Sequence, residues 1–270
     1  MTNHPIYKLF SRDMAYSLSY GKYKYLIFYC IIAALSLMTS LQLKSFDSNS
    51  VGTFYLLLKD NGYIKLLSEY EVPVNWTFIQ FFVLFLIGDF LFQDIGKNRS
   101  YLLLRCRSKG QYILAKMGWI VAQSMILYIG VFVVIYFVSS LVLCDFSIGA
   151  SPFFTDMIAP LMEIRITPGD LILRIILGYF MTTLVLSSIQ LLCIQFISPA
   201  IAYFGVIILG GISTFSDLKW LPAIHSMILK QTIFDIEHQL TLRFSILYSL
   251  VLYVLISIIT FFVFKEKDIL

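Results

Sequence analysis

Asp89 is the one carboxylate that stands well inside an apolar run, with Gly88 before it and Phe90 after it. An acidic group at membrane depth indicates a functional site by default, because its charge is costly in hydrocarbon. Proton coupling in a carrier is one possible role. A structural ion pair is the role that we favour, because basic residues follow a short distance along the chain.

The segment 93–116 is the second place where residue types suggest a specific role. It carries cations around an apolar block, Tyr101 to Leu104, that is too short to cross a bilayer. A short helix held against the membrane by Leu102 and Leu103 would present its basic residues to the cytoplasm, where another protein or anionic lipid could bind. The alternative is a charge signal that only orients the chain. The cations are Lys97, Arg99, Arg105, Arg107, Lys109 and Lys116.

Known catalytic and metal-binding motifs are missing from the sequence. It contains no G-x-x-x-x-G-K-[ST] phosphate loop, no H-E-x-x-H zinc motif and no G-x-S-x-G nucleophile motif. The three histidines, His4, His225 and His238, fall in the N-terminal arm and in the last long connection. The four cysteines have no paired spacing, so we interpret them as packing residues. We therefore expect no catalytic residue, no metal and no bound cofactor, and any ATP would be hydrolysed by another subunit.

The elements that must position these residues are apolar runs. Hydrophobic residues make up 59% of the 270 positions and charged residues 13%, whereas soluble domains have about 25% charged residues. The runs are close to the 20 residues that a helix needs to span a bilayer, and they are apolar on every face, unlike barrel strands. The sequence thus predicts an all-α membrane protein forming one domain, with six spans at about 23–41, 76–92, 117–143, 171–196, 200–214 and 244–264.

The distribution of Lys and Arg predicts that both termini are cytoplasmic. Twelve of the 20 basic residues lie in the N-terminal arm and the start of the first run, in the segment 93–116 and in the C-terminal tail. Basic residues collect on the cytoplasmic side of membrane proteins, and six spans place both ends on one side. A multi-pass protein of the plasma membrane is the expected localisation.

Local patterns predict three element boundaries. Ile6, Phe10, Met14 and Leu18 recur every four residues beside polar positions, which is typical of an amphipathic helix lying in the inner interface. Thr167 begins a capping-box pattern, so span four should start there. Ser198 followed by a proline predicts the N-cap of span five.

This arrangement resembles the membrane subunits of type-2 ABC exporters, small bacterial permeases that pair with a separate ATP-binding subunit. The resemblance rests on six spans, cytoplasmic ends, the amphipathic N-terminal helix and the basic loop between spans two and three. In that family the loop carries the coupling helix. The features that match the family loop are Asp94, Gly96, Leu102 with Leu103, Arg105, Arg107 with Ser108, and Lys116; the glutamate-arginine pair and the proline of the family pattern are absent.

The resemblance implies a working unit of two permeases, identical or different, and two cytoplasmic ATPase subunits, which would hold ATP and magnesium. The coupling residues implied for this chain are Asp94, Gly96, Arg99, Leu102, Leu103, Arg105, Arg107 and Lys109. The substrate would be hydrophobic or amphipathic, such as a peptide, an antibiotic or a lipid, and nothing points to nucleic acid. Two alternatives remain: a non-transporting assembly or immunity protein, and a secondary carrier.

Overall fold

The computed structural model describes residues 5–63, 71–97 and 108–266, and these residues form helices joined by loops and short turns. The apolar runs of the sequence explain why, because a backbone in hydrocarbon must satisfy its own hydrogen bonds within each segment. The α-helices are α1 (Pro5–Leu43), α2 (Ser50–Leu58), α3 (Val74–Lys97), α5 (Lys109–Leu143), α6 (Pro168–Cys193), α7 (Pro199–Phe215) and α8 (Leu242–Glu266).

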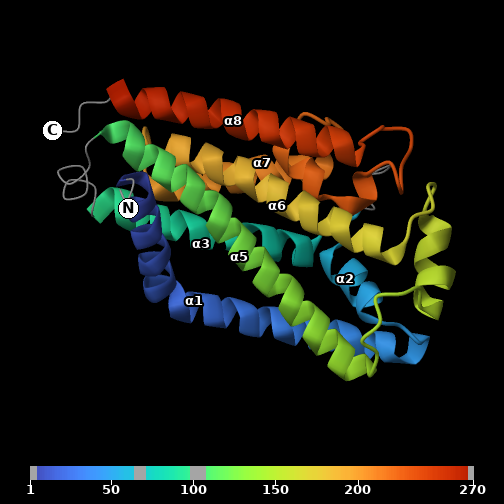
Figure 1. The fold of residues 1–270 in the computed structure, drawn as a ribbon. Coiled ribbons are helices and arrows are strands. Elements are labelled where there is room, and N and C mark those ends of the chain that lie inside the picture. The colour runs from blue at the N-terminus through green and yellow to red at the C-terminus, as the bar shows by residue number, and fades with distance from the viewer. Residues whose placement is uncertain (1–4, 64–70, 98–107, 267–270) are drawn as a thin grey trace.

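The long helices run roughly side by side along one direction (Figure 1). Helices α1 and α5 begin, and α3 and α8 end, at the same end of the bundle, which we call the proximal end. Helix α2 and the connections around it lie at the other end, which we call the distal end. The first and last described residues are therefore both proximal.

Five helices are long and apolar enough to cross a membrane: α1, α3, α5, α6 and α8. Helix α7, at the predicted fifth span, is apolar but has only 17 residues. The prediction of several long apolar helices is confirmed. All six predicted apolar runs are helical, and the differences from the sequence prediction are in their boundaries.

Several boundaries differ from those predicted, and α3 continues to Lys97 rather than ending near residue 92. The amphipathic segment and the first run form one helix, α1, which turns sharply in its first part (Figure 1). Helix α5 begins at Lys109 rather than near residue 117, and α6 ends at Cys193 rather than at 196. The predicted loop 93–116 is correspondingly shorter. The N-terminal turns of α1 and α5 contain polar residues. These residues contact each other across the two helices, so both helices begin before the apolar runs.

The predicted caps form as expected. Thr167 Oγ1 accepts a hydrogen bond from the backbone N–H of Asp170, and Ser198 Oγ accepts one from Ile201. Both helices then begin with a proline, which has no N–H to leave unpaired. Ser108 caps α5 in the same way.

Buried polar side chains join the helices in the middle of the bundle. Gln80 of α3 donates from Nε2 to Thr183 Oγ1 of α6 over 2.8 Å, and the Tyr128 hydroxyl of α5 lies 2.6 Å from the same oxygen. All three residues are nearly inaccessible to solvent. Such bonds between transmembrane helices add specificity where apolar side chains distinguish poorly between helix and lipid.

The distal connection 216–241 packs into the bundle instead of lying over it. Its short 3₁₀ helices η5 (Pro222–Ser226) and η6 (Ile228–Lys230) contact α6, and η5 also contacts α7. The approach is close at Gly178 of α6, where a Cβ atom would lie 2.8 Å from the His225 carbonyl oxygen. Thr182 donates its hydroxyl to the Pro222 carbonyl oxygen over 3.3 Å.

The other distal connections are also short and helical in part. They contain η1 (Lys44–Phe46), a π-helical turn η3 (Phe154–Ile158) and η4 (Ala159–Leu161). Asn49 caps α2 and also donates from Nδ2 to the Gly149 carbonyl oxygen over 2.8 Å. The connections before α2 and after α5 are thereby joined.

Candidate functional site: a buried charge cluster at the proximal end

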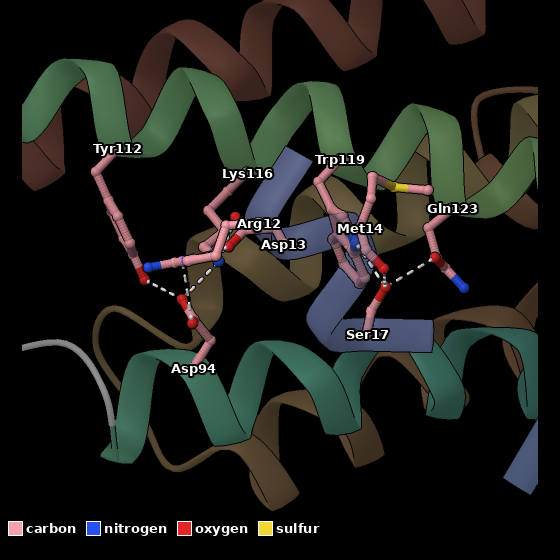
Figure 2. Close-up of polar contacts among 9 residues, drawn as sticks. All are labelled: Arg12, Asp13, Met14, Ser17, Asp94, Tyr112, Lys116, Trp119 and Gln123. Carbon is pink, nitrogen blue, oxygen red and sulfur yellow. Dashed lines mark hydrogen bonds and ion pairs between the residues drawn. The ribbon is translucent and has the colours of Figure 1, made fainter. Parts of the chain in front are cut away.

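Lys116 of α5 is the centre of the candidate site. Its ammonium nitrogen lies 2.7 Å from Asp13 Oδ2 of α1 and 2.5 Å from Asp94 Oδ2 of α3. The lysine side chain is fully buried and the two carboxylates are 2% exposed. The Tyr112 hydroxyl, also on α5, donates to Asp94 Oδ2 over 2.7 Å. Figure 2 shows these side chains converging from three helices.

Arg12 completes the cluster and balances its charge. Its guanidinium group pairs with the neighbouring Asp13 and lies 3.4 Å from Asp94 Oδ1. Arg12 is the most exposed member, with 34% of its side chain accessible. Two cations therefore meet two carboxylates, and the cluster as a whole is neutral.

The cluster makes one unit of three helices that are far apart in sequence. Removing one member of a buried ion pair costs about 3–5 kcal/mol, because the remaining partner keeps an uncompensated charge. A relative movement of α1, α3 or α5 would have to separate the same charges. The cluster therefore opposes relative movement of the three helices, so a displacement of one helix is expected to displace the other two.

Helical spacing explains how the sequence places these groups. Tyr112, Lys116, Trp119 and Gln123 follow each other at intervals of four, three and four, so they share one face of α5. On α1, Ser17 stands one turn after Asp13, where it accepts a hydrogen bond from Trp119 Nε1 over 3.2 Å.

The same face extends the contact between α1 and α5. Ser17 Oγ also lies 3.3 Å from Gln123 Oε1, and the bend of α1 lies close to Ser17 (Figure 2). The indole ring of Trp119 stacks on Phe90 of α3 at a centroid distance of 4.1 Å. Polar and aromatic contacts thus hold the bent part of α1 against both α3 and α5.

Asp89 forms a separate ion pair on the same side of the bundle. Its Oδ2 lies 2.5 Å from the Lys24 ammonium of α1, and 17% of its side chain is exposed. An ion pair is present, as expected. The partner is a lysine of the first helix rather than one of the cations that follow α3, because Lys24 lies on the part of α1 that packs beside α3.

Of the residues predicted for coupling, the structure describes three. Asp94 is in the cluster, Gly96 lies in the last turn of α3, and Lys109 opens α5 and donates to the Lys265 carbonyl oxygen over 3.5 Å. The other predicted residues, Arg99, Leu102, Leu103, Arg105 and Arg107, lie outside the described residues. The structure thus places Asp94 and Lys109 on the two helices that flank this segment.

Sequence reasoning missed the role of Asp13 and Tyr112. Asp13 stands among basic residues of the N-terminal arm, and Tyr112 lies in the segment 93–116, so neither is conspicuous in the sequence. One feature of the sequence could have indicated the cluster. The polar residues that recur on one face of α5 can pair with the polar residues of the amphipathic N-terminal segment. This pairing could not be assigned without knowing that the two helices pack together.

A second buried lysine lies at the distal end. Lys230 donates from Nζ to the carbonyl oxygens of Ser213, Thr214 and Ser216 over 3.0–3.1 Å, and so satisfies the last turn of α7. Burial lowers the pKa of Lys230, and the negative charge of Asp60 partly opposes this shift. Burial raises the pKa of Asp60, which accepts hydrogen bonds from the backbone N–H groups of Gly62 and Leu229.

His225 precedes Lys230 in the same connection. Its side chain is buried and has one ring nitrogen without a hydrogen-bond partner among the described residues. Its Nδ1 lies 3.0 Å from Ser245 Oγ, whereas Nε2 has no partner among the described residues. Burial lowers the pKa of His225 to about 4, because the charged imidazolium would lose its hydration. The side chain is therefore neutral near pH 7.

The described residues contain no group of histidine, cysteine or acidic side chains that could hold a metal ion. Cys30 and Cys144 are exposed free cysteines and Cys193 is partly buried. Their interpretation as packing residues stays a prediction. Cys106 lies outside the described residues.

The long apolar helices and their polar interhelical contacts define a multi-pass helical membrane protein. The chain belongs to the family described as "Protein of unknown function (DUF2705)", whose model matches residues 26–270. No curated protein and no solved structure matches the chain. Asp94, Lys116 and Tyr112 lie within the matched range, whereas Arg12 and Asp13 precede it.

Proposed function

We propose that this protein is the permease subunit of an ATP-binding-cassette exporter. It has six spans, including α7, and both termini are in the cytoplasm. Two permeases and two ATPase subunits form the transporter, which moves a hydrophobic or amphipathic substrate across the plasma membrane. The sequence resemblance to type-2 exporters motivates the proposal, and the distribution of basic residues supports the orientation.

The observation that carries the proposal is the position of the buried charge cluster. A permease that responds to an ATPase needs a stiff connection from its cytoplasmic loop to its helices. The basic segment 98–107 runs from the end of α3 to the start of α5, and Lys116 ties both of these helices to α1. A force applied to the segment would therefore be passed to three helices together.

The alternative of a proton-coupled carrier has less support. Such a carrier needs an acidic group that can change its protonation state during transport. Asp89 is held by Lys24, and the carboxylates of the cluster are held by Lys116. These pairings favour a structural role for the acidic groups.

The test is co-purification from native membranes in mild detergent, with partners identified by mass spectrometry. The intact chain is compared with a variant in which Arg99, Arg105 and Arg107 are changed to glutamate. The matched control changes three exposed cations of the distal end, Lys44, Arg165 and Arg243, to glutamate, which alters the net charge equally.

The proposal predicts that an ABC ATPase is recovered with the intact chain and with the distal control, and is lost with the loop variant. ATPase activity stimulated by the permease should follow the same pattern. If no ATPase is recovered with the intact chain, the exporter function is wrong and a non-transporting role takes its place. Equal loss in both variants would contradict the assignment of the docking surface to the proximal loop.

A further inference from the structure

A side cavity opens between α3, α6 and the start of α7. Its volume is about 370 Å³, and it is lined by aromatic and other apolar side chains with few polar groups. Phe85 and Phe204 at the cavity are 39% and 63% exposed, so the lining continues into an exposed apolar face of the bundle. A molecule dissolved in the bilayer would reach this cavity from the side. The residues used below are Phe85, Asp89, Gln190, Ala200, Tyr203 and Phe204.

Gln190 gives the cavity an unpaired polar group. Its side chain is 1% exposed and lines the cavity, and its Oε1 has no hydrogen-bond partner among the described residues. Gly88 makes the placement possible, since a Cβ atom there would lie 2.0 Å from Gln190 Nε2. A buried amide without a partner costs free energy, and a ligand that supplies the partner recovers it.

The charges around the cavity favour a neutral ligand head. Asp89 lines the cavity but is already paired with Lys24 at 2.5 Å, so the site has no net charge. An ammonium group would have to displace Lys24, and a carboxylate would be repelled by Asp89. A hydroxyl or amide group can donate to the amide oxygen without disturbing the ion pair.

Contacts between α7 and α3 hold the walls of the cavity in place. The Tyr203 hydroxyl donates to the Phe81 carbonyl oxygen over 3.0 Å, which joins α7 to α3 beside the cavity. At Gly210, further along α7, a Cβ atom would lie 2.4 Å from the Phe81 ring, so the two helices approach closely. The walls therefore do not need to be assembled by the ligand.

We propose that this cavity binds a neutral amphiphile, a single apolar chain whose head group is a hydroxyl or an amide. The chain lies against Phe85 and Phe204, and the head donates a hydrogen bond to Gln190. The proposal does not depend on the exporter function, because binding is measured on the purified chain without an ATPase.

The test is photolabelling in lipid nanodiscs with a long-chain alcohol that carries a diazirine, followed by mapping of the labelled peptides. Competition with unlabelled decanol, its methyl ether, decylammonium and decanoate ranks the head groups. Three variants are compared with the natural chain. Ala200→Trp fills the cavity, Gln190→Met removes the amide at similar length, and Ile208→Trp places the same bulk on an exposed position of α7 that does not line the cavity.

Labelling should map to α3 and the start of α7, and Ala200→Trp should abolish it while Ile208→Trp leaves it unchanged. Gln190→Met should weaken decanol binding about tenfold, and the ether should compete about tenfold less well than decanol, as expected for one lost hydrogen bond. Because Gln190→Met removes an unpaired polar group, its unfolding midpoint should not fall, which separates lost binding from lost folding.

Three results would overturn the inference. Equal competition by decanol and its ether, with unchanged binding to Gln190→Met, would show that the cavity only holds apolar chains. Stronger competition by decylammonium or decanoate than by decanol would show that the ligand head is charged. Labelling that persists in Ala200→Trp would place the probe elsewhere.

Discussion

Among the described residues, one lysine is buried at each end of the bundle, and the two are satisfied in different ways. Lys116 at the proximal end lies between two carboxylates from other helices, whereas Lys230 at the distal end donates to two carbonyl oxygens of the last turn of α7 and to that of its C-cap residue, Ser216. The first arrangement joins three helices through formal charges. The second completes a single helix, where the partial negative charge of the C-terminal carbonyls favours a cation. A buried lysine therefore has two different structural roles in this chain.

The largest expected effect is at Lys116. Changing Lys116 to methionine keeps the length of the side chain but leaves Asp13 and Asp94 with only the partly exposed Arg12 to balance their two charges. We expect the free energy of unfolding to fall by about 3–5 kcal/mol. Titration with sodium dodecyl sulfate in mixed micelles measures this change.

A compensated variant sharpens this test. In Lys116→Met combined with Asp13→Asn and Asp94→Asn, no buried carboxylate remains. Arg12 loses both partners, but its side chain is 34% exposed and can be hydrated, so most of the lost stability should return. A triple variant that is as unstable as the single one would mean that packing of the lysine stem, rather than charge, holds the cluster together.

The next effect concerns acid and the distal region. The pKa of His225 is about 4 in the folded protein, below its ordinary value of 6.5. Between these values the unfolded chain binds a proton that the folded protein does not, so stability is lost as the pH falls from about 6.5 to about 4. The loss is at most about 3 kcal/mol, since one pKa unit corresponds to about 1.36 kcal/mol.

The measurement compares unfolding free energies at pH 7 and pH 4.5 for the natural chain and for His225→Asn. The variant can still pair with Ser245 but does not titrate in this range. Its stability should change less with pH than that of the natural chain. Identical pH dependence in the two proteins would place the acid sensitivity in other groups.

A smaller effect is expected at Lys230. Lys230→Met leaves carbonyl oxygens at the end of α7 without a donor, and no carboxylate lies within ion-pair distance among the described contacts. We expect a loss of about 1–3 kcal/mol, below that of Lys116→Met. A larger loss than at Lys116 would reverse the comparison and make the distal lysine the more important one. The same titration measures both variants.

The smallest effect is at the opposite end of α7, where Ser198 caps the first turn. Ser198→Ala removes one hydrogen bond at an exposed position, so we expect a loss of about 0.5–1 kcal/mol. Ser198→Asp is the matched control, because aspartate can still accept the capping bond. It should retain the stability of the natural chain in the same titration.

The sequence predicted the helices well but not the cluster. Apolar runs depend on local composition, so all six were found, and the caps at Thr167 and Ser198 were found because their partners are three residues away. Asp13 and Lys116 have partners that are about a hundred residues distant. Polar residues beside an apolar run predict a loop when their tertiary partners are unknown. For this reason the helices predicted at these two runs were too short.

The same distinction applies to the side cavity. Asp89 was recognised because a carboxylate in an apolar run is conspicuous. Gln190 carries no charge and interrupts its run only slightly, so nothing in the sequence marks it. Its importance arises from the absence of a partner for Oε1 among the described residues, and this is a property of the packing of α3 against α6.

The capping of α7 by Lys230 has a consequence for biogenesis. Helix α7 has only 17 residues, and the donor for its last carbonyl oxygens stands downstream of it in the chain. When α7 leaves the ribosome, its C-terminal turn has no donor until the connection as far as Lys230 has been synthesised and has folded back between α6 and α7. We therefore expect the C-terminal turn of α7 to reach its final hydrogen bonding only after the connection that follows it has folded.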